Sequence, residues 1–184
     1  EAWLANNGGA TASDLCGNFT WSNNYCVDGY DNLVTIDAAA SWEAFWNVSN
    51  TNSNGDQLDF VFNGSLGADL PFAGSVLDAE NNTITLRPNR INDADPFWQT
   101  GNLLGNKYMD ISSFVTDASL ANQAFTFGGS VSSNTLDAEY DAVAFIRVFN
   151  ADFTAVLFEV TASLDSDTFA LTYNGDAADA AFAQ

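Results

Sequence analysis

Hydrophobic and polar residues alternate over many short segments of this chain, and β-branched and aromatic residues are concentrated in those segments. Asn, Asp, Gly and Ser cluster between them, and helical periodicity is hard to find. The pattern predicts about nine strands, at Leu33 to Asp37, Trp42 to Val48, Gln57 to Asn63, Thr83 to Arg87, Lys107 to Ile111, Ala124 to Val131, Asp141 to Asn150, Phe153 to Ala162 and Thr168 to Tyr173.

One segment, Ser112 to Gln123, departs from this alternation, because Thr, Asp and Ser interrupt its apolar residues. It is either a short helix or an irregular crossover strand. Many short strands with at most one short helix favour an all-β fold, either a β-sandwich or a jelly roll. The 184 residues contain no repeat and no linker, so we expect a single domain over residues 1–184.

The two longest predicted strands, Asp141 to Asn150 and Phe153 to Ala162, are separated by a short turn and predict a hairpin. Both faces of the first strand are largely apolar, which is typical of a central strand covered on one side by the opposite sheet and on the other by loops or ligand. Arg147 is the exception on this strand. It either pairs with one of the many carboxylates or contacts a ligand.

The charge of the chain narrows the classes of partner. It has 24 Asp and Glu, 4 Lys and Arg and no His, for a formal net charge of −20. Binding to nucleic acid or to an anionic membrane surface requires many cations, so neither is expected. Acidic disordered chains are poor in aromatic residues, whereas aromatic residues make up 14% of this one, which predicts a folded core.

The N-terminal part, residues 1–30, carries both cysteines, Cys16 and Cys26. No apolar run approaches the roughly 18 residues of a membrane span, so no membrane insertion is expected, and Glu1 resembles the start of a mature secreted chain. In an exported protein two cysteines favour a disulfide, which would stabilise the fold by about 3 kcal/mol. Two free buried thiols are the alternative.

The residue inventory argues against catalysis. Without His there is no Ser-His-Asp or Cys-His arrangement and no imidazole zinc site. A glycoside hydrolase needs only two carboxylates at a defined separation, but no tight acidic motif suggests one. We therefore expect a protein that is not an enzyme, with a glycoside hydrolase or lyase as the least favoured alternative.

Oxygen-bearing side chains crowd several predicted loops and indicate a structural calcium ion. The sequence Asp28-Gly29-Tyr30-Asp31 is one such loop, and Asp93 and Asp95 lie in another. Asn and Asp in loops also serve ordinary turns by bonding to their own backbone. Calcium is thus an expectation whose candidate ligands are Asp28, Asp31, Asp93 and Asp95.

Aromatic and amide side chains suggest a sugar-binding surface, since apolar sugar faces stack on exposed rings while amides bond hydroxyls. Trp42 and Trp46 are expected on one face of a strand, and Trp98 lies in a polar segment that is hard to bury. Gln57 is a candidate polar contact. The alternative is that Trp42 and Trp46 belong to the core.

The C-terminal residues after Tyr173 are rich in Ala, where a jelly roll would continue into a closing strand. Three explanations remain open: the chain is a truncated piece, the Ala-rich tail is itself that strand, or a neighbouring molecule supplies it. The third would make the protein a subunit that assembles by strand donation.

The second half of the chain resembles the jelly-roll carbohydrate-binding modules of secreted bacterial polysaccharide-degrading enzymes. The resemblance lies in strand order and turn spacing, through Gly105-Asn-Lys-Tyr-Met109, Ala124-Phe-Thr-Phe-Gly-Gly-Ser-Val131, Ala142-Val-Ala-Phe-Ile-Arg-Val-Phe149 and Thr168-Phe-Ala-Leu171. It implies an extracellular, non-catalytic domain that binds polysaccharide, often with a structural calcium. The alternative is a structural subunit of an extracellular filament or surface layer that assembles by β-strand donation.

Overall fold

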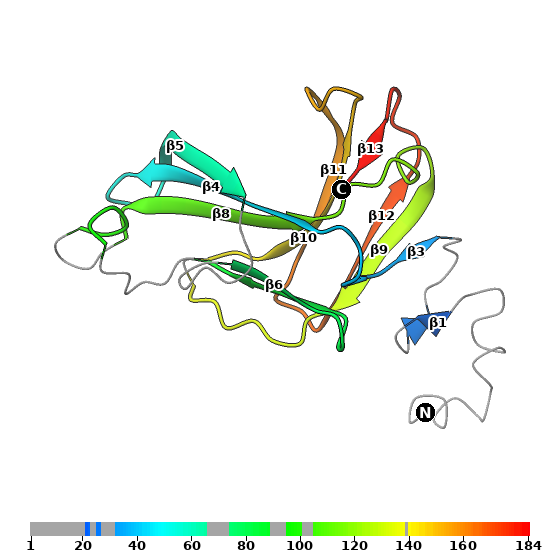
Figure 1. Ribbon diagram of the computed structural model, residues 1–184, viewed down its shortest axis with the longest axis horizontal. Coiled ribbons are helices and arrows are strands. Elements are labelled where there is room, and N and C mark those ends of the chain that lie inside the picture. Colours follow the sequence, from blue (N-terminus) through cyan, green and yellow to red (C-terminus); the bar gives the residue numbers. More distant parts are fainter. Residues whose placement is uncertain are drawn as a thin grey trace. The chain divides into compact units, whose positions relative to one another are not determined.

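The computed structural model of the chain describes residues 21–22, 25–26, 32–65, 74–88, 95–100, 105–138 and 140–184. Every regular element in this part of the chain is a strand (Figure 1), so the expected all-β fold class is confirmed. None of the described residues forms a helix that could cross a membrane. The strands are β1 (Trp21–Ser22), β2 (Tyr25–Cys26), β3 (Leu33–Val34), β4 (Glu43–Thr51), β5 (Gln57–Ser65), β6 (Gly74–Asp78), β7 (Thr83–Arg87), β8 (Lys107–Phe114), β9 (Ala124–Ser130), β10 (Val143–Phe149), β11 (Val156–Ser163), β12 (Thr168–Asn174) and β13 (Phe182–Ala183).

The chain divides into two compact units, which are described separately below. Unit 1 comprises residues 1–35 and 117–184, and unit 2 comprises residues 36–116. Unit 2 is therefore one continuous segment, whereas unit 1 is assembled from both ends of the chain. The expectation of a single domain over residues 1–184 stays a prediction.

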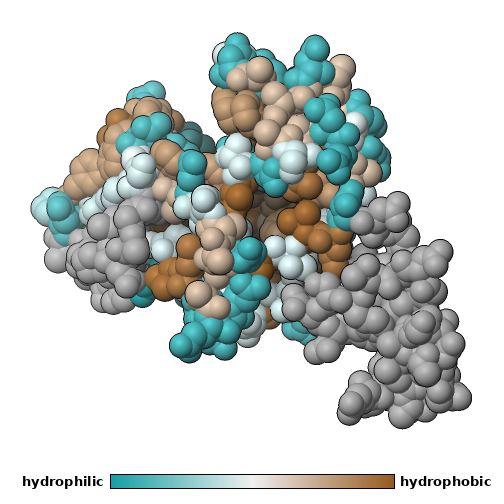
Figure 2. Space-filling view, turned by 45° about the vertical axis from the view of Figure 1, so that its right-hand side comes forward, coloured by the Kyte–Doolittle hydropathy of each residue, from teal (hydrophilic) through white to brown (hydrophobic). Residues whose placement is uncertain are grey.

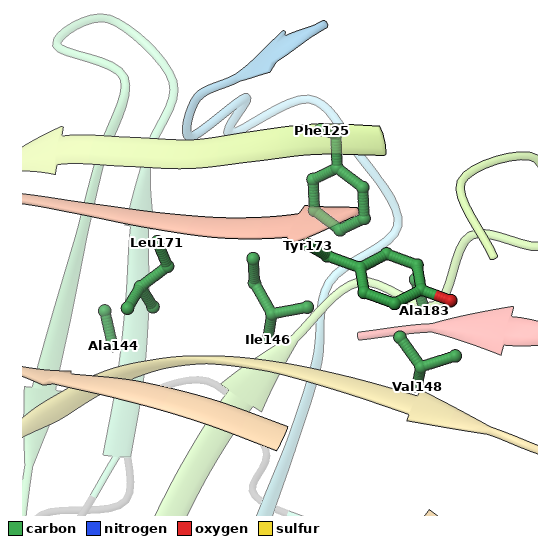
Figure 3. Packing of buried hydrophobic residues seen from close by; sticks show 7 residues of the cluster. All are labelled: Phe125, Ala144, Ile146, Val148, Leu171, Tyr173 and Ala183. Atoms are coloured by element: carbon green, nitrogen blue, oxygen red, sulfur yellow. The ribbon is translucent and has the colours of Figure 1, made fainter. Parts of the chain in front are cut away.

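Unit 1 is a two-layer β-sandwich. Its first sheet has the order β11-β10-β13 and its second the order β12-β9-β3, in which β3 runs parallel to β9. Alternate residues of β10 point toward the second sheet and meet side chains of β9 and β12 (Figure 3). The resulting core consists of Phe125, Ala144, Ile146, Val148, Leu171, Tyr173 and Ala183, each at most 7% exposed.

The Ala-rich C-terminal tail ends in the short strand β13, which pairs with β10 at Val148 and Phe149. Backbone hydrogen bonds of 2.8 Å in both directions between Arg147 and Gln184 extend this pairing. Of the three explanations for the tail, the structure favours the one in which the tail is itself the closing strand. This edge of β10 is therefore occupied by the chain's own tail.

Unit 2 contains a three-stranded antiparallel sheet, β5-β4-β8, and the hairpin β6-β7. A hydrogen bond of 3.1 Å between the hydroxyls of Ser75 and Ser113 joins the hairpin to β8. The pairing of β4 with β8 is regular, but its pairing with β5 shifts register twice. In these bulges β5 has one residue more than β4, and this changes the face on which its side chains lie.

Several predicted elements need correction. Trp42 lies before β4 rather than in it, so the expected strand from Trp42 to Val48 is displaced toward its C-terminal side. The segment Ser112 to Gln123 contains no helix: its first residues extend β8 and the rest forms turns around an isolated bridge at Asp117. Strands β1, β2 and β6 were not anticipated, and β13 was expected only as one of three explanations for the tail. The predicted hairpin of β10 and β11 is confirmed, with a bulge between Val148 and Phe149.

Candidate functional site

Two of the predicted aromatic residues, Trp46 and Trp98, come together on one face of the unit 2 sheet. Their ring centroids are 6.0 Å apart. Phe62 packs edge-on to Trp46 at 5.3 Å, and Phe97 packs edge-on to Trp98 at 4.8 Å. Both Trp residues are partly buried. We call these four residues the aromatic cluster.

The aromatic cluster belongs to the packed side of the sheet. Val48, on the same face of β4 as Trp46, is fully buried. Gly64 lies opposite Trp46 on β5, and a Cβ atom there would be only 2.7 Å from the indole Nε1, so the ring needs this glycine. The surroundings of Trp46 therefore match the alternative expectation, in which its ring packs in the core, better than they match an exposed ring.

Trp42 is separate from this cluster, contrary to the expectation that it shares a strand face with Trp46. It precedes β4, and its indole Nε1 donates a hydrogen bond of 2.7 Å to the carbonyl oxygen of Asp37. The indole thereby ties the entry of β4 to the preceding turn. It does not extend the row of rings around Trp46.

The opposite face of the same sheet is exposed around its polar residues, although Ser49 at its centre is buried. Asn63, Asn47 and Asp110 lie side by side in register on β5, β4 and β8, and all three are exposed. In the neighbouring row, Phe60 and Tyr108 flank Ser49 and are 60% and 43% exposed. The two outer strands are separated by about 9.6 Å, twice the normal strand spacing.

The three polar side chains of this row are available to a ligand. Among the described residues, the side chains of Asn47, Asn63 and Asp110 make no hydrogen bond or ion pair with another protein group. Gln57 also belongs to this face, since its Nε2 donates a 3.0 Å hydrogen bond to the hydroxyl of Ser49. We call the surface formed by Asn47, Gln57, Phe60, Asn63, Tyr108 and Asp110 the open face.

Neither Lys107 nor Arg147 belongs to the open face. Lys107 is on the other side of β8, with Nζ 4.6 Å from the ring centroid of Phe97. Arg147 belongs to unit 1, where it contacts the directly opposite Glu159 at 2.9 Å and lies 4.7 Å from the ring of Phe145. The structure thus pairs Arg147 with a carboxylate, which is one of its two expected roles.

Of the four predicted calcium ligands, only Asp95 lies within the described residues. Asp28, Asp31 and Asp93 lie outside the described residues, as does Cys16, and the side chain of Cys26 is not described. Asp95 is exposed, and its Oδ1 accepts a 2.9 Å hydrogen bond from the backbone of Phe97. Across the described ranges, no group of three or more His, Cys, Asp or Glu could hold a metal ion.

Sequence reasoning missed most of the open face. Tyr108 and Asp110 alternate on the predicted strand from Lys107 to Ile111, so strand periodicity could have paired them. Phe60 gave no such signal, because strict alternation places it with Phe62 on the packed side. The bulge at Val61 moves it to the open face instead.

Comparison with known proteins gives no relative to which these features could be matched: no family model matches the chain, and neither a curated protein nor a solved structure is significantly similar to it.

Proposed function

We propose that this protein is an extracellular, non-catalytic module that binds polysaccharide, and that the open face of the unit 2 sheet is its binding surface. The observation that carries the proposal is the row of Asn63, Asn47 and Asp110, three exposed polar side chains without protein partners beside exposed rings. A sheet that only needed a solvated side would not require two exposed aromatic residues next to this row.

The chemistry of the open face suits sugar rings. Sugar hydroxyls both donate and accept hydrogen bonds, and Asn amides do the same, while the Asp110 carboxylate accepts. The rings of Phe60 and Tyr108 offer apolar surfaces on which the C–H faces of a sugar can stack. The polar row spans three strands, so it can contact more than one sugar unit of a polymer.

The test is a binding screen of the purified chain against soluble and insoluble polysaccharides, followed by the variant Tyr108→Ala. Loss of one aromatic contact is expected to weaken binding about threefold to tenfold. The single variant Asn47→Ala should weaken binding more than Tyr108→Ala does, because it removes the central amide of the row. Affinity is read by isothermal titration calorimetry, and folding by circular dichroism.

The matched control is Leu86→Ala on β7, which removes an apolar side chain of similar exposure, 42% against 43% for Tyr108. It should leave affinity unchanged. Equal affinities of the wild-type protein and Tyr108→Ala for every polysaccharide bound would exclude the open face as the site, and turnover of any polysaccharide would overturn the non-catalytic assignment.

A second candidate function, self-assembly by strand addition, is favoured by strand β5. It is nine residues long and ends its sheet within the described residues, and Leu58 and Val61 on it are 50% and 37% exposed. Figure 2 shows hydrophobic surface interspersed with hydrophilic surface on the described residues. Unpaired edges with apolar side chains are templates for another strand.

Light scattering separates the two functions. An assembling protein should form large species that disappear in the double variant Leu58→Lys and Val61→Lys, because charged residues on an edge oppose pairing. Leu86→Lys is the control with a similarly exposed residue on another strand. A monomer at all concentrations would remove this candidate and leave polysaccharide binding in place.

A further inference from the structure

The charges around the open face specify which polysaccharides it can accept. Asp110 lies in the polar row itself, and Glu43 lies on the same face of β4, two residues before Phe45 and opposite Phe114. Both carboxylates are exposed, and neither has an ion-pair partner among the described residues. An anionic group brought to this face would meet uncompensated negative charge.

Cations are few in this chain, and two of them have other contacts. The chain has only 4 Lys and Arg, namely Arg87, Arg90, Lys107 and Arg147. Lys107 contacts Phe97 on the other side of the sheet, and Arg147 pairs with Glu159 in unit 1. Arg87 lies on the β6-β7 hairpin, and Arg90 is outside the described residues.

The charge of the whole molecule acts in the same direction. A net charge of −20 on 184 residues repels a polyanion at distances up to the screening length, which is about 10 Å at 0.1 M salt. Recognition of sulfate or carboxylate groups relies on Arg and Lys in direct contact, which the open face lacks. The groups that it does offer, amides, one carboxylate and two rings, match hydroxyls and C–H surfaces.

This inference rests on the proposed function of the open face. We propose that the face binds uncharged polysaccharide. Asp110 contacts a sugar hydroxyl there, and its negative charge excludes sulfated and uronic acid polymers. Since no ionic contact is made with the ligand, affinity should be nearly independent of salt. A hydrogen bond from a hydroxyl to a carboxylate is stronger than one to a neutral amide. Asp110→Asn should therefore weaken binding of the uncharged polymer and ease the exclusion of anionic ones.

The experiment compares an uncharged β-glucan, alginate as a carboxylated polymer and carrageenan as a sulfated one, at 20 and 500 mM NaCl with EDTA present to prevent bridging by calcium. For the wild-type protein we expect binding of the β-glucan with less than about a twofold change between the salts, and no binding of the two polyanions at 20 mM. Asp110→Asn should lose about threefold to tenfold in affinity for the β-glucan.

The control is Glu80→Gln, which changes the net charge equally but lies in the turn between β6 and β7. It should bind the β-glucan as the wild-type protein does. Binding of alginate or carrageenan as tightly as the β-glucan would overturn the uncharged ligand class while leaving polysaccharide binding intact. An equal loss in Glu80→Gln and Asp110→Asn would overturn the contact made by Asp110. Binding of none of the uncharged or anionic polymers would instead contradict the proposed function itself.

Discussion

Tyr173 shows how a single residue connects the layers and loops of unit 1. Its ring is fully buried and contacts Phe125 and Phe158, with centroid distances of 5.9 and 4.9 Å. Its hydroxyl donates to the carbonyl of Ala121 at 3.0 Å and accepts from the amide of Ala177 at 3.1 Å. One side chain thus fixes two loops that flank the sandwich.

Replacement Tyr173→Phe keeps the ring but leaves these two backbone groups without a partner. An unsatisfied buried group costs about 1 to 3 kcal/mol, so the free energy of unfolding should fall by that amount. Urea denaturation measures it, with Tyr108→Phe as the control in which an exposed hydroxyl is removed. Equal stability of the two variants would show that the buried hydroxyl bonds contribute nothing.

Phe153, in the turn between β10 and β11, adopts a left-handed conformation with φ of 57°, which is unusual for a bulky residue. The turn is held by side-chain bonds, including 2.9 Å from Asn150 Nδ2 to Thr154 Oγ1 and 2.7 Å from that hydroxyl to Asp152 Oδ1. The ring of Phe153 stacks on the ring of Phe182 in β13, with 4.6 Å between the ring centroids. The turn and the closing strand are therefore coupled.

Two substitutions at this position separate strain from stacking. Both Phe153→Ala and Phe153→Gly remove the ring, but only Gly tolerates the left-handed region, so the Gly variant should be more stable than the Ala variant by about 1 kcal/mol. At Val156, in the adjacent strand β11, the order of Ala and Gly should be reversed. Thermal unfolding of the four variants provides the measurement, and a lower stability of the Gly variant at 153 would contradict the strain.

At the scale of elements, two hairpin turns are each stabilised by hydrogen bonds to a carboxylate. In the β6-β7 turn, hydrogen bonds from the side chain and backbone of Asn81 lower the pKa of Asp78 below its usual 3.8. In the β10-β11 turn, a hydrogen bond from the hydroxyl of Thr154 lowers the pKa of Asp152 in the same way. Each carboxylate stabilises its turn only while it is ionised.

The sign of the pH dependence follows from the direction of these shifts. A folded-state pKa below the unfolded value contributes stability that is complete above the unfolded pKa and is lost as pH falls through the folded pKa. The two turns should therefore loosen below about pH 4, where carboxylates begin to protonate. NMR titration of the carboxyl carbons checks this, and a pKa above 3.8 for either Asp78 or Asp152 would contradict it.

The same elements show what the sequence could and could not predict. The range of β7 and the pairing of β10 with β11 follow from alternation and turn residues, because each strand pairs with a close neighbour in sequence. The bulges of β5 have no such local signal, since they arise from register with β4, and they decide that Phe60 joins the open face. Likewise, β13 is too short to produce a periodic pattern and is defined by the edge of β10.

At the scale of the whole molecule, the net charge of −20 should govern stability and its response to ions. Self-repulsion destabilises a compact acidic protein, so NaCl should raise the melting temperature by screening. If calcium binds as expected, CaCl2 at the same ionic strength should raise it further, because a ligand that prefers the folded state stabilises by mass action. Differential scanning fluorimetry with MgCl2 as the control measures this, and equal effects of both salts would remove the calcium site.

The split of unit 1 between the two ends of the chain sets an order for folding during synthesis. Strand β3 must wait for its partner β9, which begins 90 residues later at Ala124, and β10 gains β13 only after Ala183 is made. Unit 2 is continuous, so its strands can pair while the partners of β3 are still absent. During synthesis the middle of this sequence would thus fold first, and the sandwich would be completed once β13 has emerged.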